Sequence, residues 1–349
     1  MRSLLADARD DSAGARSETR WGIIGSGNIA GAFARGLASA PGATLRAVGS
    51  RTQERAALFA ADHSVPRAYG SYREVAEDPT VDVVYVATPH AVHYENTMMC
   101  LEAGKPVLCE KPLAATAKQA EEMARLARAR GLFLMEGMWT FTFPAMARAI
   151  ELVGTGAIGR VVSVSANLGF AATASPDSRL FRPELGGGAL LDVGVYGIAV
   201  SNAVAGSPPE SIVAAAAIEE HGVDQTTTIL LRYRGGAIAS VVCSIAAQLS
   251  GTAWIGGSEG SIEIPPKFSQ PDRVVLRKPG KEAVELAFPR IGNGYSFEAL
   301  EVMRCLASGE TESPAVPIQR SLETLSICDR VREQIGLRFP FEPQAARGA

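Results

Sequence analysis

Short apolar runs alternate with longer segments of helical periodicity from Trp21 onward. Apolar positions spaced three and four apart predict helices that bury one face, and short continuous apolar runs predict buried strands. Such alternation is typical of a parallel sheet whose strands are joined by helices. The expected strands are 20–24, 44–50, 83–88, 106–109 and 132–135, and the expected helices are 29–38, 53–62, 71–77, 91–103 and 117–130.

After about Phe143 the pattern changes to segments rich in β-branched residues and bounded by glycine or proline. These predict a mostly antiparallel sheet, one face of which can stay open to a ligand or a second subunit. The expected strands are 161–169, 211–218, 226–233, 237–244 and 274–277, and a closing amphipathic helix is expected at 318–335. We therefore predict a flexible extension at 1–19, an α/β domain at 20–142 and an α+β domain with a large open-faced sheet at 143–345.

Length and composition agree with two globular domains, since 349 residues exceed the size at which one core stops growing. The apolar runs are shorter than the roughly 20 residues of a spanning helix, and residues 1–19 lack the apolar centre of a secretory signal. A net charge of −3 without a basic stripe argues against nucleic acid as a partner. The five cysteines show no paired spacing, so we expect a reducing, cytoplasmic compartment and no metal site.

A glycine turn follows the first predicted strand and opens the first predicted helix. The first glycine permits the tight turn, the second lets backbone approach a pyrophosphate, and Ala30 lets the helix pack against the strand. The N–H groups at the helix start then attract phosphate oxygens. The turn predicts that 20–142 is a Rossmann domain, which binds a dinucleotide through Gly25, Ser26, Gly27, Asn28 and Ile29.

The end of the second predicted strand indicates which dinucleotide binds. An acidic residue there would accept hydrogen bonds from the ribose of NAD, but this chain reads Gly49-Ser50-Arg51-Thr52. Arg51 can pair with a 2′-phosphate, and Ser50 and Thr52 can donate hydroxyl hydrogen bonds. The alternative is that Arg51 is a solvated loop residue. We predict NADP as the cofactor, with NAD as the alternative.

Two further motifs supply candidate chemistry. Glu110 and Lys111 follow a predicted strand at the edge where ligands of open α/β sheets bind, although a surface ion pair is the alternative. Gly186 to Tyr196 begins with three glycines and also contains Asp192 and Tyr196, which share one face if a helix begins there. A phenol has an ordinary pKa of about 10, so acid–base work near neutrality needs a nearby cation such as Lys111. A core tyrosine with a satisfied hydroxyl is the alternative.

Together these motifs resemble the Gfo/Idh/MocA family of NAD(P)-dependent oxidoreductases over about residues 20–340. The resemblance rests on the glycine turn, on the Thr88-Pro89-His90 segment followed by His93, on 103–113 and on 186–196. Tyr196, where many members carry histidine, and the segment 135–139 are similar to the branch of dimeric dihydrodiol dehydrogenase, NADP-dependent xylose dehydrogenase and glucose-fructose oxidoreductase. His90 departs from the asparagine common in the wider family.

The resemblance implies a dehydrogenase or reductase that acts on CH–OH groups of a sugar or cyclic diol. It implies that Tyr196 is the acid/base, that Lys111 orients the substrate hydroxyl and tunes Tyr196, and that Asp192 positions the pair or binds a sugar hydroxyl. A homodimer or dimer of dimers through the open sheet is also implied. Further cofactor contacts are expected from Thr88, Pro89, His90, His93, Glu110 and Lys111, and substrate contacts, or plain core packing, from Trp139, Phe170 and Trp254.

Three other functions are compatible with parts of the pattern. One is an NAD-dependent member of the same family. Another is a non-catalytic regulator that senses a dinucleotide, although such a protein would not need Lys111, Asp192 and Tyr196. The third is a glycosidase of the same fold that uses tightly held NAD for transient oxidation.

Overall fold

The computed structural model describes residues 18–173, 175 and 178–342, so nearly all of the predicted extension lies outside it. Six parallel strands of the described chain form one sheet in the order β3-β2-β1-β4-β5-β6. The reversal between β1 and β4 is the switch point of a Rossmann domain, as predicted. The strands are β1 (Thr19–Ile24), β2 (Ala43–Gly49), β3 (Arg67–Tyr69), β4 (Val83–Val86), β5 (Val107–Glu110) and β6 (Leu134–Gly137).

Capping side chains fix where several Rossmann helices begin. Thr52, Ser71 and Thr116 each accept a backbone N–H from the first turn of the helix that follows. The third helix in this group ends at Gly131, which adopts the left-handed conformation that favours glycine. The helices are α1 (Asn28–Leu37), α2 (Gln53–His63), α3 (Tyr72–Glu77), α4 (His93–Glu102), preceded by η2 (His90–Val92), and α5 (Ala117–Arg130).

A second sheet of the described chain has eight strands in the order β14-β13-β12-β11-β7-β10-β9-β8. Neighbouring strands are antiparallel except β10 and β7, which confirms the mostly antiparallel prediction. The strands are β7 (Val161–Gly169), β8 (Ser211–Ile218), β9 (Asp224–Arg232), β10 (Ile238–Ser244), β11 (Ala253–Gly257), β12 (Ser261–Ile264), β13 (Arg273–Arg277) and β14 (Val284–Ala287).

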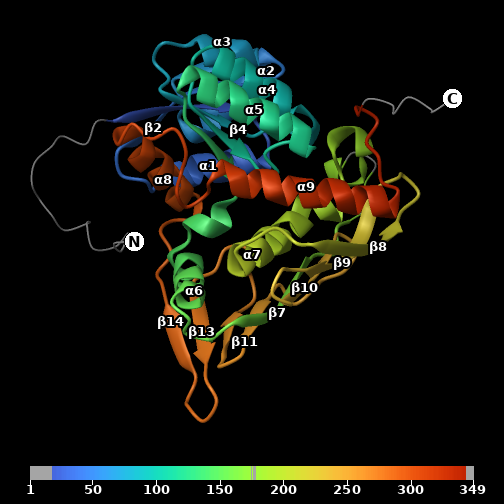
Figure 1. The fold of residues 1–349 in the computed structure, drawn as a ribbon. Coiled ribbons are helices and arrows are strands. Elements are labelled where there is room, and N and C mark those ends of the chain that lie inside the picture. The colour runs from blue at the N-terminus through green and yellow to red at the C-terminus, as the bar shows by residue number, and fades with distance from the viewer. Residues whose placement is uncertain (1–17, 174, 176–177, 343–349) are drawn as a thin grey trace, which may run out of the picture.

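Helices cover one face of this sheet and leave the other open (Figure 1). The covering elements are α6 (Pro144–Gly154), η6 (Leu190–Gly194), α7 (Val195–Ala205) and α9 (Ile318–Ile335). Gly197 allows close packing of α7, because a Cβ there would lie 2.6 Å from Val241 Cγ1. On the other face Val213, Leu230, Ile238 and Trp254 are exposed. Alternation along the strands separates these two sets of side chains.

One stretch, Pro183–Ala205, is long and apolar enough to cross a membrane, contrary to the expectation that no such run exists. Of its most apolar window, 89% is buried inside the protein. A core helix of a folded domain passes the same test of length and composition, and α7 packs in this way between the second sheet and α9.

The C-terminal helices join the two halves of the chain. Helix α8 (Tyr295–Ala307) packs on α1, and α9 packs on both α5 and α7 (Figure 1). Ser321 donates to Glu136 at 2.6 Å, and the backbone N–H of Ala117 donates to Asp329 at 2.9 Å. The last part of the chain therefore holds the Rossmann domain and the second sheet in a fixed relation.

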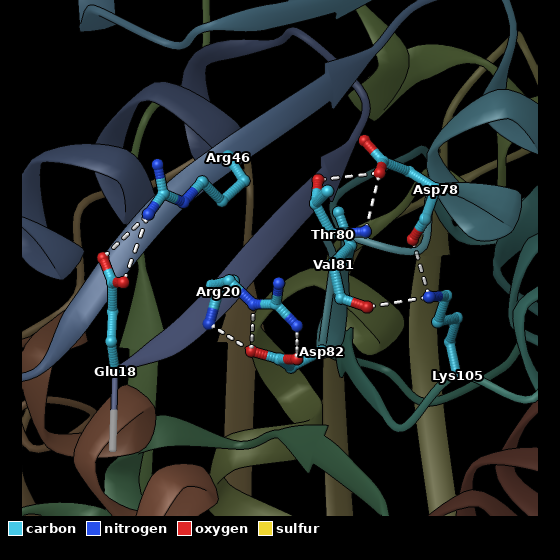
Figure 2. A network of polar contacts seen from close by, with 8 residues as sticks. All are labelled: Glu18, Arg20, Arg46, Asp78, Thr80, Val81, Asp82 and Lys105. Carbon is cyan, nitrogen blue, oxygen red and sulfur yellow. Dashed lines mark hydrogen bonds and ion pairs between the residues drawn. The ribbon is translucent and has the colours of Figure 1, made fainter. Parts of the chain in front are cut away.

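Ion pairs and hydrogen bonds tie together the N-terminal ends of the Rossmann strands, as Figure 2 shows. Arg20 binds Asp82 through its backbone N–H at 2.8 Å and its Nε at 2.9 Å. Lys105 Nζ donates to the carbonyl oxygens of Asp78 and Val81, at 2.7 Å each. These contacts link the starts of β1, β4 and β5 at the edge away from the glycine turn.

Candidate active site

The glycine turn between β1 and α1 has the shape that a dinucleotide requires. Gly25 has a φ of 106°, and a Cβ there would lie 2.7 Å from the carbonyl oxygen of Ala87. A Cβ on Gly27, by contrast, would meet no atom within 4 Å among the described residues. Gly27 also begins α1 without a capping side chain. The first-turn N–H groups therefore face open space, which fits a pyrophosphate.

Two arginines follow the end of β2. Arg51 is exposed, and neither it nor Arg55 makes an ion pair within the described part of the chain. Burial raises the pKa of Tyr72, whereas the charges of Arg51 and Arg55 oppose that rise, so both guanidinium groups lie near one phenol. Sequence reasoning missed Arg55, whose signal was its place in the first turn of the helix that follows Arg51.

The two hydroxyl residues beside Arg51 have partners within the protein. Ser50 Oγ lies 2.8 Å from Ser26 Oγ, which joins the end of β2 to the glycine turn. Thr52 Oγ1 accepts the backbone N–H of Arg55 at 3.3 Å and so caps α2. A hollow beside this turn is lined by Ser26, Arg55, Leu58, Phe59 and Asp62.

The two histidines after β4 hold loops in place. His93 is fully buried, with Nδ1 2.8 Å from the oxygen of Pro112 and Nε2 2.7 Å from that of Thr88. Burial lowers the pKa of His93 to about 4, so the ring is neutral and donates to one of these carbonyls. Its side chain thus serves the loop rather than an open surface.

His90 connects the two domains. Its Nδ1 lies 3.1 Å from the carbonyl oxygen of Gly186. Burial, followed by the charges of Arg179 and Lys111, holds the pKa of His90 well below its ordinary value. A neutral ring that donates from Nδ1 keeps Nε2 as a hydrogen-bond acceptor.

Lys111 contacts the segment 186–196, as the sequence predicted. Its Nζ lies 2.5 Å from the main-chain oxygen of Asp192, 3.5 Å from Asp192 Oδ1, and 5.2 Å from the centroid of the Tyr196 ring. Lys111 comes from the end of β5, and the other two residues come from η6 and α7. Lys111 and Asp192 are 81 positions apart in sequence. Two distant stretches of the chain therefore meet between the domains.

Asp192 carries a second cation that sequence reasoning missed. Arg179, from η4 (Arg179–Phe181), places Nη2 2.7 Å from Asp192 Oδ1. Burial alone would raise the pKa of Asp192, but Lys111 and Arg179 outweigh it and hold that pKa well below its usual range. Asp192 is therefore a firm carboxylate. Nothing in the local sequence distinguished Arg179 from other loop arginines.

Tyr196 is a phenol that keeps its proton. Burial, then the carboxyl groups of Glu110, Asp192 and Glu298, hold its pKa well above the ordinary value. Lys111 was expected to favour the phenolate of Tyr196, but burial and three carboxyl groups raise the Tyr196 pKa. The Trp139 indole opposes this rise in pKa, although its Nε1 has no hydrogen-bond partner among the described residues.

Two buried carboxyl groups lie behind this site. Glu110 accepts a hydrogen bond from the Tyr85 hydroxyl and another, at 3.1 Å, from the backbone N–H of Lys111. Burial raises the pKa of Glu110, and burial together with Glu110 raises that of Glu298 well above its ordinary value. Neither oxygen of Glu298 has a hydrogen-bond partner within the described chain. Glu110 thus points inward, and Glu298 was not foreseen.

The turn that carries Asp192 is wider than predicted. We expected an α-helix from the glycines onward, but Leu190–Gly194 forms a π-helical turn before α7. Gly194 packs against β10 there, since a Cβ would lie 2.9 Å from Cys243 Sγ. Such turns are frequent at functional sites. Intrinsic helix propensity does not distinguish them from α-helix.

The three aromatic candidates fall in different places. The Trp139 ring lies 4.5 Å from that of Tyr295, on the Tyr196 side. Phe170 packs against a cluster that contains Val193 of the π-helical turn. Trp254 was wrongly predicted as a substrate contact. It pairs with Ser165 on the open sheet face, opposite the face that α7 covers, because side chains alternate along β11.

Comparisons with known proteins cover most of the chain. Residues 19–138 match the family model described as oxidoreductase family, NAD-binding Rossmann fold, and residues 146–263 match that of the GFO/IDH/MocA C-terminal domain. The chain is 39% identical to human trans-1,2-dihydrobenzene-1,2-diol dehydrogenase over 329 residues, which is 92% of this chain and 98% of the human one. The mouse enzyme of the same name gives 39% over 332 residues, with the same coverage.

Solved structures with the same fold include two oxidoreductases. KijD10, a 3-ketoreductase from Actinomadura kijaniata in complex with NADP and TDP-benzene, is 28% identical with a TM-score of 0.81, covering 91% of this chain and 98% of its own. An aldose-aldose oxidoreductase from Caulobacter crescentus, complexed with glycerol, is 25% identical with a TM-score of 0.83, covering 91% and 97%.

Proposed function

The chain belongs to the GFO/IDH/MocA family of oxidoreductases, and we propose that it uses NADP to interconvert an alcohol and a carbonyl on a cyclic diol or sugar. The observation that supports this most is the meeting of Lys111, Asp192 and Tyr196 at the carboxyl edge of the Rossmann sheet. That edge is where open α/β sheets bind their ligands. A regulator that only sensed a dinucleotide would not need a proton donor beside a buried cation.

The chain's own groups divide the work of the reaction. The glycine turn and the start of α1 hold the pyrophosphate, and the nicotinamide, when bound, gives or takes the hydride. Lys111 attracts the substrate oxygen and favours negative charge on it. Tyr196 gives its proton to that oxygen in reduction and takes it back in oxidation. Its raised pKa makes it ready for the first of these directions.

Asp192 keeps the ammonium of Lys111 in place. It accepts from Lys111 through its main-chain oxygen and lies within ion-pair range through its carboxylate. Arg179 binds the same carboxylate from outside. Because Asp192 also binds Arg179, its carboxylate does not fully neutralise the ammonium of Lys111. That ammonium can therefore attract the substrate oxygen.

NADP is favoured over NAD by the two arginines after β2. Arg51 precedes α2 and Arg55 lies in its first turn, both near the Tyr72 phenol, and a planar guanidinium suits a 2′-phosphate. No acidic side chain stands at the end of β2, where an NAD-specific domain carries one. The related 3-ketoreductase was solved with NADP.

A trans-dihydrodiol is the first substrate to try, because relatives at 39% identity carry that substrate in their names. The Trp139 ring is half-buried beside Tyr196, and an aromatic ring there suits contact with a flat substrate. Aldoses come second, given the aldose-aldose oxidoreductase.

The open sheet face, with Val213, Leu230 and Trp254 exposed, is the surface for a second copy of the chain.

The test follows nicotinamide absorbance with purified protein, NADP or NAD, and a panel of trans-dihydrobenzenediol, xylose, glucose and inositol. We expect turnover with NADP and a kcat/KM for NADP at least about tenfold above that for NAD. Arg51→Gln should remove most of this preference by raising the KM for NADP and leaving that for NAD unchanged. A wild-type preference for NAD that Arg51→Gln does not alter contradicts the cofactor assignment.

A further inference from the structure

A buried carboxyl group outside the catalytic trio holds the start of the helix that carries Asp192 and Tyr196. Asp224 is the first residue of β9 and is fully buried. Its Oδ2 accepts the backbone N–H of Leu190 at 2.8 Å and the hydroxyl of Thr227 at 2.6 Å. Leu190 begins the π-helical turn that contains Asp192. We call residues 190–196, which include Asp192 and Tyr196, the catalytic segment. The carboxyl group therefore contacts this segment two residues before Asp192.

The glycine turn before this segment is shaped around the same carboxyl group. Gly188 has a φ of 111°, and a Cβ there would lie 2.1 Å from Asp224 Oδ1. Only glycine permits both that backbone conformation and that contact. Gly188 is also fixed from the other side, because its N–H donates to the Leu180 oxygen at 2.9 Å. The geometry of the turn and the position of Asp224 are therefore interdependent.

No ion pair neutralises the charge of Asp224 within the described part of the chain. Burial raises its pKa to about 6, against the Thr227 hydroxyl and the N–H groups of Leu190 and Ala189, and none of these main influences is a cation. The titratable neighbours on β10 and α9 are Cys243 and Cys328, thiols whose pKa values burial raises. Its Oδ1 makes no hydrogen bond to any described residue. The group is thus a carboxylate at neutral pH and protonated in mild acid.

We propose that Asp224 is a positioning residue whose carboxylate fixes the first turn of the catalytic segment, and whose protonation loosens that turn. An ionised carboxylate accepts stronger N–H hydrogen bonds than a neutral carboxyl, and it suits the positive end of a helix. This inference rests on the proposed function, because it assigns the turn a part in turnover.

The contact between the domains makes the position of this turn matter. Lys111 Nζ binds the main-chain oxygen of Asp192, so a displaced turn moves the ammonium as well as the carboxylate. The glycine turn at Gly25 lies in the other domain and does not touch Asp224. Loosening the turn should therefore lower kcat and leave the affinity for NADPH unchanged.

Asp224→Asn is the direct test, because the amide has the shape of the acid and imitates its neutral form. Turnover is followed in the carbonyl-reduction direction, in which Tyr196 acts protonated and its own ionisation does not interfere. Wild-type kcat should fall as pH drops through about 6. Asp224→Asn should show a kcat about fivefold to tenfold lower at neutral pH, no ionisation near pH 6, and an unchanged KM for NADPH.

Thr227→Val shifts the same ionisation in a known direction. The Thr227 hydroxyl lowers the pKa of Asp224, so its loss should move the acid limb of the wild-type profile to higher pH. Asp82→Asn is the matched control, since it removes a structural carboxylate at the far edge and should leave the kcat profile unchanged.

Amide hydrogen exchange over residues 189–196 supplies a measurement that does not depend on turnover. We expect faster exchange in Asp224→Asn than in the wild type at the same pH, with the glycine turn at Gly25 unaffected. If Asp224→Asn keeps the wild-type kcat, acid limb and exchange rates, the inference is wrong while the proposed function stands. If the wild type turns over no carbonyl or alcohol in the panel, the proposed function fails, and the exchange result still decides the role of Asp224.

Discussion

At the N-terminal edge of the Rossmann sheet charged side chains bind one another, whereas at the C-terminal edge they converge on a site between the domains. Arg20 and Asp82 form a partly exposed pair, and Lys105 binds two carbonyl oxygens (Figure 2). At the other edge Lys111 and Arg179 share one buried carboxylate, and Tyr196 holds its proton.

The pKa directions express this difference. Asp82 has a lowered pKa, first because of its hydrogen bonds from Arg20. Tyr196 and Glu298 have strongly raised values, chiefly because they are buried. Charges that satisfy one another stabilise the fold, while groups removed from water without full compensation are typical of functional sites. One sheet thus uses one edge for stability and the other for chemistry.

Exchanging the two lysines for methionine should separate these roles most strongly. Lys111→Met removes the ammonium beside Tyr196, and we expect kcat to fall about a hundredfold to a thousandfold. Lys105→Met removes a donor to Asp78 and Val81 and should leave kcat unchanged. Its cost should instead appear as about 1–3 kcal/mol of unfolding free energy. Equal kcat values for the two variants would contradict the division between the edges.

Alanine at the two turn glycines sharpens the comparison within the C-terminal edge. A Cβ on Gly27 meets no described atom, so Gly27→Ala should fold normally and raise the KM for NADP at least about tenfold by obstructing the phosphate. Gly25→Ala places a Cβ against Ala87 at a φ of 106° and should cost about 2 kcal/mol of stability. Thermal unfolding and cofactor titration distinguish the two. A Gly27→Ala variant with wild-type KM would remove the phosphate site from the turn.

Asp82→Asn tests the N-terminal edge and should have the smallest effect. Because the Asp82 pKa is lower in the folded than in the unfolded chain, its contribution is present above pH about 4 and is lost as pH falls further. The side chain is 35% exposed, so solvent screening limits that contribution to about 1 kcal/mol or less. Urea unfolding at neutral pH and at pH about 3 should show the difference from wild type shrinking in acid. A difference that grew in acid would mean that Asp82 is not stabilised as a carboxylate.

Most of the fold was predictable because its hydrophobic pattern is periodic. Helices 117–130 and 318–335 and strands 161–169 and 211–218 have the bounds that the sequence predicted. Five elements of the second domain were missed, and tertiary packing rather than local pattern fixes them. They are α6, α8, β11, β12 and β14, several of which are short or alternate only weakly. The three-residue β3 was missed for the same reason.

The site was predictable where a motif has a mechanical reason. The turn at Gly25 and the meeting of Lys111 with Asp192 and Tyr196 follow from motifs at strand ends. Arg179 and Glu298 could not be foreseen, because their roles arise only from long-range packing. Trp254 shows the converse error, since an aromatic residue in sequence does not reveal which sheet face it occupies.

The most direct test of the central claim compares wild type with Tyr196→Phe in the same assay of NADP reduction by a trans-dihydrodiol. Phenylalanine keeps the ring packing and removes only the hydroxyl that exchanges a proton with the substrate oxygen. We predict that Tyr196→Phe binds NADPH and unfolds as the wild type does, while its kcat falls about a hundredfold or more. A variant that reduces NADP at the wild-type rate would show that the phenol takes no part in the reaction.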